Sequence, residues 1–121
     1  MTLYYHATPA SNVASILRRG IRPSKGRWGE NHETPRIYLS NDSNASYLVA
    51  GQMILDHGIE EVTVLQVSIP YQLERKLRID PEWEAEPEFG RAYYLEGSIP
   101  AHMIRRVLET YSRDDYDRES S

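Results

Sequence analysis

The chain has no cysteine among its 121 residues and no apolar run long enough to cross a bilayer. Without cysteine it can form no disulfide, thiolate metal ligand or thiol nucleophile. A membrane-spanning helix needs about 18 consecutive apolar residues, so the sequence predicts a protein that does not span a membrane. No secretory signal precedes Tyr4, and this favours a cytoplasmic location.

Other absences narrow the class of protein. No Gly-x-Gly-x-x-Gly motif occurs, and the chain is too short for a doubly wound dinucleotide-binding fold. His32, His57 and His102 show no metal-ligand spacing, so no metal site is expected. The formal net charge of -4 disfavours sequence-independent binding of DNA or RNA, because proteins that coat nucleic acids are basic.

Hydrophobic patterns predict one domain in which strands outnumber helices. Strands are expected at residues 3–6, 37–40, 61–69, 91–96 and 104–111, because these segments are rich in aromatic or β-branched residues. Two helices are expected, one closed by Gly20 and one that follows the polar caps of residues 41–43, runs to about His57 and stops at Gly58. Strands and helices do not alternate strictly. We therefore expect an α+β domain with a small split or mixed β-sheet core and flanking helices.

The domain is expected to occupy residues 1–111, and the polar residues 112–121 are expected to form a disordered tail. Residues 23–36 show no periodicity, and a loop of this length in a compact domain is more often functional than idle. Residues 18–36 carry six basic side chains against two acidic ones, whereas residues 80–88 carry five acidic and no basic ones. The first segment would attract phosphate and the second would repel it.

Three short segments carry side chains that suit one kind of chemistry. His6 ends the first expected strand, Tyr38 lies in a central strand, and Glu96 precedes an Ile-Pro pair late in the chain. Histidine can hydrogen-bond a ribose hydroxyl, and tyrosine can stack against a flat heterocycle. A carboxylate can offset the positive charge of an oxocarbenium-like transition state. Breaking the bond between nicotinamide and ribose in NAD needs these groups and no metal.

Together the segments resemble the ADP-ribosyltransferase superfamily, in particular its His-Tyr-Glu branch, which includes diphtheria toxin and the poly(ADP-ribose) polymerases. The similarity covers most of residues 3–108. It implies an ADP-ribosyltransferase-like fold with NAD as co-substrate and no metal. The implied activity is NAD-dependent mono-ADP-ribosyltransfer, a glycosyltransferase reaction that modifies a macromolecular acceptor and releases nicotinamide.

The resemblance also implies roles for single residues. Glu96, His6 and Tyr38 would be catalytic. Tyr38 and Tyr47 would sandwich nicotinamide, and Ala7 would hold its carboxamide through the backbone. Ribose, the amide and the pyrophosphate would be bound by further residues, so that the expected NAD-binding set is His6, Ala7, Thr8, Tyr38, Ser40, Ser43, Tyr47, Arg27 and Arg36.

Several alternatives stay open. Glu86 or Glu88 could take the role of Glu96, although the Ile-Pro context favours Glu96. The acidic loop around Trp83 favours a protein acceptor over a nucleic acid. The same scaffold also serves RNA 2′-phosphotransfer, and a non-catalytic module that binds NAD or ADP-ribose is a third reading.

Overall fold

The computed structural model describes residues 1–24, 35–81, 83 and 90–117, and its centre is a six-stranded sheet of order β4-β5-β2-β1-β3-β6. The strands are β1 (Thr2–Pro9), β2 (Ile37–Ser40), β3 (Glu61–Ile69), β4 (Arg78–Ile79), β5 (Ala92–Leu95) and β6 (Ile104–Ser112). All pairings between these strands are antiparallel. The expected α+β class is confirmed, and the sheet of the described residues is antiparallel rather than mixed.

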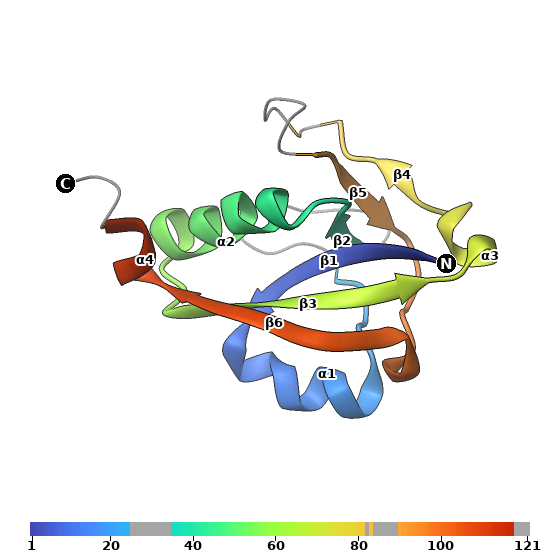
Figure 1. The fold of residues 1–121 in the computed structure, drawn as a ribbon, viewed down its shortest axis with the longest axis horizontal. Coiled ribbons are helices and arrows are strands. Elements are labelled where there is room, and N and C mark those ends of the chain that lie inside the picture. Colours follow the sequence, from blue (N-terminus) through green and yellow to red (C-terminus); the bar gives the residue numbers. More distant parts are fainter. Residues whose placement is uncertain (25–34, 82, 84–89, 118–121) are drawn as a thin grey trace.

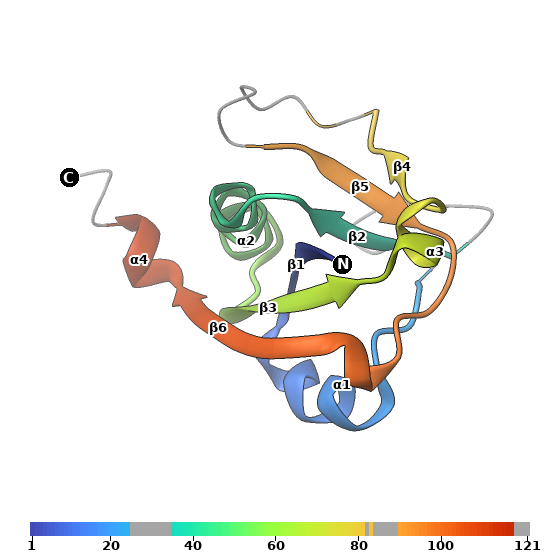
Figure 2. The same cartoon turned by 45° about the vertical axis from the view of Figure 1, so that its right-hand side comes forward.

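The sheet consists of two three-stranded halves that are joined weakly. β1 pairs with β3 through eight residue pairs, and β2 pairs with β5 through four. Between β1 and β2 there is one pair, Tyr5 with Ser40. Figure 2 shows β4 and β5 diverging from β3 and β6 on either side of this junction. The two halves therefore separate beyond Tyr5.

Helices cover both faces of the sheet (Figure 1). They are α1 (Val13–Arg19), α2 (Ser43–His57), α3 (Tyr71–Glu74) and α4 (Arg113–Asp117), with short 3₁₀ turns at η1 (Ala10–Asn12) and η3 (Ala101–Met103). Within the described ranges, no helix is both long and apolar enough to cross a membrane.

The two main helices bury different faces of the same strands. Ile16 of α1 packs in the core that contains Leu65, whereas Met53 of α2 packs against Val62. Val62 and Leu65 are three residues apart on β3, so their side chains point to opposite faces. Asp42 begins α2, because its side chain accepts a hydrogen bond from the Asn44 N–H at 2.7 Å.

The C-terminal segment differs from the disordered tail expected after residue 111. β6 continues to Ser112, and the α4 helix follows it. Tyr116 of α4 stacks on Tyr47 of α2 with ring centroids 4.7 Å apart, and its hydroxyl donates to the Tyr47 carbonyl oxygen at 2.7 Å. It lies over Gly51, where a Cβ would meet the Tyr116 ring at 2.7 Å. Burial of this aromatic ring holds the segment in place; residues 118–121 lie outside the described ranges.

Gly20 ends α1 in a conformation that only glycine adopts readily. Its φ is +83° and its ψ is −177°, and a Cβ here would clash with the carbonyl oxygen of Ile99. The next residue, Ile21, exchanges two backbone hydrogen bonds with Ile99, at 2.8 and 2.9 Å. The end of α1 is therefore fixed against the segment that follows β5.

We predict that Gly20→Ala destabilises the protein by about 1–3 kcal/mol or more, because it combines backbone strain with a clash. Gly58→Ala is the matched control. Gly58 also has a positive φ, +72°, but a methyl group added there would have no neighbouring atom within 4 Å. Urea unfolding of both variants measures the difference. If Gly20→Ala and Gly58→Ala lose the same free energy of unfolding, a methyl group at residue 20 does not clash with the Ile99 carbonyl oxygen, and the prediction is wrong.

Candidate functional site

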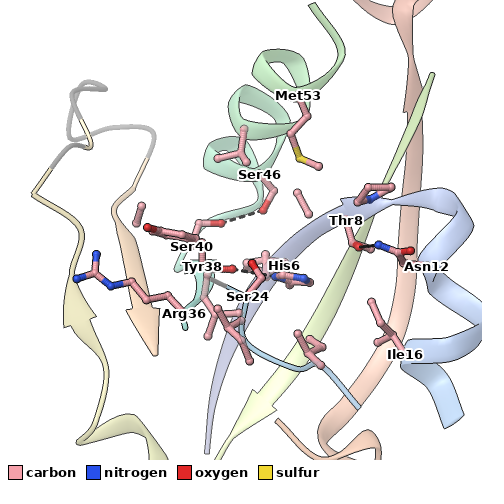
Figure 3. A pocket seen from close by; sticks show the side chains of 18 of the residues that line it. His6, Thr8, Asn12, Ile16, Ser24, Arg36, Tyr38, Ser40, Ser46 and Met53 are labelled. Atoms are coloured by element: carbon pink, nitrogen blue, oxygen red, sulfur yellow. Dashed lines mark hydrogen bonds between the residues drawn. The ribbon is translucent and has the colours of Figure 1, made fainter. Parts of the chain in front are cut away.

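A cavity of about 700 Å³ opens where β1 and β2 separate. Five consecutive residues of β1, 5–9, and all four of β2, 37–40, line it. Successive side chains of a strand point to opposite faces, so a cavity that contacts four in a row lies in the gap between the strands. α1 and α2 supply further walls (Figure 3). The volume is within the roughly 300–1,000 Å³ typical of small-molecule sites.

His6 bridges the two halves of the sheet at this gap. Its Nδ1 lies 2.8 Å from the carbonyl oxygen of Tyr38 (Figure 3). A carbonyl oxygen can only accept, so Nδ1 carries the proton and donates, and in the neutral ring Nε2 is an acceptor. Burial lowers the pKa of His6 below its ordinary value of 6.5, against the opposing effect of the Tyr38 carbonyl. The imidazole is therefore held neutral, with one tautomer selected.

Two more hydrogen-bonded pairs stand on the cavity wall. Ser40 of β2 and Ser46 of α2 join their hydroxyl oxygens at 2.9 Å, and both are buried. On the opposite side, the Asn12 amide donates to the Thr8 hydroxyl at 3.5 Å. Figure 3 shows these pairs on either side of His6. The first pair offers hydroxyl groups, and the second a hydroxyl and an amide, that a polar ligand could bind.

Arg36 connects the cavity to Glu96. Its guanidinium carbon lies 4.1 Å from the centroid of the Tyr94 ring, a cation–π geometry, and its Nε lies 3.9 Å from Glu96 Oε1. This distance is that of an ion pair and is too long for a hydrogen bond. Hydrogen bonding to the Tyr38 side chain raises the pKa of Arg36. The Glu96 side chain is itself about 42% exposed.

The described part of the cavity lining is basic although the whole chain is acidic. Three arginines, Arg19, Arg22 and Arg36, line it there together with one acidic residue, Asp80. Arg19 and Arg22 lie on either side of Gly20 and Ile21, and Ile21 forms two backbone hydrogen bonds with Ile99. The backbone positions of both arginines are therefore fixed. Such a wall suits a ligand that carries phosphate groups.

The structure brings together six of the residues expected from the sequence. The side chains or backbone of His6, Ala7, Thr8, Arg36, Tyr38 and Ser40 all line the one cavity. Glu96 does not line it, but it contacts Arg36, which does. Arg27 and the alternative carboxylates Glu86 and Glu88 lie outside the described residues.

Two expected residues lie elsewhere. Ser43 is exposed in the first turn of α2, and it is not part of the cavity wall. Tyr47 packs against Tyr116 and Tyr111, with ring centroids 4.7 and 5.2 Å away, so its ring is engaged on the side of α4. The arrangement gives no support to a nicotinamide sandwich formed by Tyr38 and Tyr47.

Sequence reasoning missed Ser46 and the two arginines of the α1 end. Ser46 belongs to a run of small residues that face the sheet, with Ala45 and Ala50. Small residues on one face of a helix indicate that the helix packs closely against the sheet. The hydroxyl of Ser46 on that face could have suggested a polar group at the contact. Arg19 and Arg22 were visible only as part of a basic segment, since nothing in the sequence shows that Ile21 pairs with Ile99.

Within the described ranges, no group of three or more His, Asp or Glu side chains is placed to hold a metal ion. A scan of the chain against models of known protein families finds no match, and a search of curated proteins also finds none. The function is therefore inferred from the cavity and its side chains.

We predict that the lowered pKa of His6 makes folding stability fall as the pH drops below about 6.5. The unfolded chain binds a proton on His6 near that pH while the folded chain does not, so stability rises with pH in this window. One such proton contributes at most about 1.4 kcal/mol per pH unit.

The measurement is urea unfolding between pH 7.5 and 5.5. His6→Gln should remove part of the slope, and the same substitution at the exposed His102 is the control for loss of an imidazole elsewhere in the chain. Identical slopes for His6→Gln and the unmodified protein would mean that His6 is protonated normally in the fold.

Proposed function

We propose that this protein is an NAD-dependent mono-ADP-ribosyltransferase that moves ADP-ribose to a macromolecular acceptor and releases nicotinamide. The observation that carries the proposal is that His6 and Tyr38 line one cavity, together with Arg36, which forms an ion pair with Glu96. These three side chains come from distant parts of the chain.

The cavity offers each part of NAD a suitable partner. Nε2 of His6 accepts a hydrogen bond from a ribose hydroxyl, since Nδ1 is committed to the Tyr38 carbonyl. The Tyr38 ring offers a flat surface to the nicotinamide. Ala7 lies beyond the single β1–β2 pair, where β1 has backbone groups free of pairing with β2 for the carboxamide. Arg19 and Arg22, which line the wall at the end of α1, would bind the pyrophosphate.

Glu96 serves the bond-breaking step. When the C1′–nitrogen bond breaks, its electron pair goes to the nicotinamide ring and positive charge develops on the ribose. A carboxylate near C1′ stabilises this charge. The acceptor's nucleophile then bonds to C1′ and loses its proton to solvent. Glu96 follows Tyr94 by two residues, and Tyr94 pairs with Tyr38, so the carboxylate can reach the ribose joined to a nicotinamide that stacks on Tyr38.

The Nε of Arg36, unsatisfied within the part of the chain that the structure describes, indicates that the distance between Arg36 and Glu96 can shorten to that of a hydrogen bond. This nitrogen is buried, and among the described residues it has no hydrogen-bond acceptor. Buried donors are nearly always satisfied in folded proteins. A shift of about 1 Å by the partly exposed carboxylate, or a ligand oxygen, would complete the bond.

The acceptor is proposed to be a protein. The reason is the acidic sequence of residues 80–88, of which Asp80 lines the cavity wall. Acidic side chains attract a basic protein surface and repel a phosphate backbone.

RNA 2′-phosphotransfer is a second candidate, favoured by one specific observation. Three arginines line the cavity, which is more than the two phosphates of NAD require. A 2′-phosphorylated oligonucleotide incubated with the protein and NAD distinguishes the two, because only this activity removes the phosphate from RNA.

We predict that Glu96→Gln lowers nicotinamide release from NAD by about 10²- to 10³-fold, because it removes the charge that stabilises the transition state. The matched control is Glu60→Gln, an exposed carboxylate outside the cavity wall. Chromatography of released nicotinamide measures the rate, and mass spectrometry of labelled lysate identifies the acceptor. Unchanged release by Glu96→Gln, or no NAD turnover by the unmodified protein, contradicts the proposal.

A further inference from the structure

Trp83 is the largest aromatic side chain on the cavity wall among the described residues, and it is held in one orientation. Its indole Nε1 donates to the Gly90 carbonyl oxygen at 3.1 Å, and its backbone N–H donates to the Asp80 carbonyl oxygen at 3.3 Å. An indole fixed in this way is a preorganised wall, which reduces the entropy cost of stacking a ligand against it.

Gly90, whose carbonyl oxygen accepts the hydrogen bond from Trp83, packs closely against the residues that precede α2. Gly90 has a φ of +81°, and a Cβ there would approach the Asp42 Cβ at 2.5 Å. Next to it, the Arg91 N–H donates to the Asn41 side-chain oxygen at 2.7 Å. The position of the indole therefore depends on the rigid junction between β5 and α2.

The register places Trp83 at one end of the β2–β5 pair. Asp80 donates its N–H to the Ala92 carbonyl oxygen at 2.9 Å, and Ala92 pairs with Ser40. Tyr38 precedes Ser40 by two residues, so it lies on the same face, about 7 Å away along the strand. Trp83 and Asp80 thus form a corner of the cavity beside Ser40, with Tyr38 next along β2.

Opposite charges occupy the two ends of the cavity. Asp80 stands at the Ala92 end of β5. Arg22 stands next to Ile21, which pairs with Ile99 beyond the other end of β5. A ligand that fits this distribution carries a positive flat group at one end and phosphates toward the other.

We propose that Trp83 and Asp80 form a corner that selects the positively charged, oxidised nicotinamide ring over neutral rings of the same size. This inference rests on the proposed function and deepens it by naming a specificity-determining pair. An indole face attracts a cation through its quadrupole, more strongly than phenylalanine or tyrosine does. A carboxylate at the same corner adds to this preference. Once the ring leaves as neutral nicotinamide, the attraction ends and release is favoured.

The test compares the affinities of NAD and NADH for the full chain by calorimetric titration. The oxidised form should bind about 2- to 30-fold more tightly, the range that corresponds to a cation–π contact. Trp83→Leu should abolish most of this ratio, Trp83→Phe should keep part of it, and Asp80→Asn should reduce it. Tyr71→Leu, at an aromatic residue that is 70% exposed on α3, is the control and should keep the full ratio.

A second probe is independent of turnover. In a Trp28→Phe background, Trp83 is the remaining tryptophan of the two in the chain, and 1-methylnicotinamide should quench its fluorescence at lower concentration than neutral nicotinamide. This result without nicotinamide release from NAD supports the corner and overturns only the proposed function. Equal quenching by both rings, or an NAD-to-NADH ratio that Trp83→Leu leaves unchanged, overturns the inference even if the protein turns over NAD.

Discussion

The hydrogen bond from the His6 imidazole to the Tyr38 carbonyl is the interaction on which the site depends. β1 and β2 pair through one pair of residues, and a sheet that parts at this point leaves backbone groups in need of partners. The imidazole supplies one partner from a side chain and so keeps the halves at a set separation. The same bond selects the ring's tautomer, because a carbonyl accepts only from a protonated nitrogen. One hydrogen bond therefore fixes both the separation of β1 from β2 and the tautomer of His6.

Rigid ties surround this gap at three points. Ile21 pairs with Ile99 at the end of α1, Ser24 pairs with Arg36 before β2, and Asn41 binds Arg91 where β5 begins. Each tie joins segments that are separate in the chain, and each includes or adjoins a residue that lines the cavity. The polar side chains of the site therefore project from fixed backbone, which is the condition for preorganised electrostatics. Within the described residues, the Arg36–Glu96 contact is the looser part, since it spans 3.9 Å between partly exposed groups.

Much of the fold was predictable because its strands are strongly patterned. β3 alternates and is rich in valine, and α2 begins at a polar cap and ends at Gly58, so both matched their expected bounds. The elements that escaped prediction, α3, β4 and α4, are two to five residues long. Such lengths are too short for periodicity to show. α4 exists because Tyr116 finds a surface on α2 opposite Gly51, a contact that local sequence does not reveal.

The sequence by itself determined the five longer strands, the α+β class and the presence of a histidine, a tyrosine and a glutamate in three of its segments, because local patterns of polarity and size suffice for these. Only the tertiary structure decided which neighbours share a cavity. It placed Ser46 on the wall rather than Ser43, turned Tyr47 toward Tyr116, and gathered the arginines on a wall that also holds Asp80. Helix rotation and strand register set these placements, and both are determined by packing across the whole molecule rather than by residues adjacent in the chain.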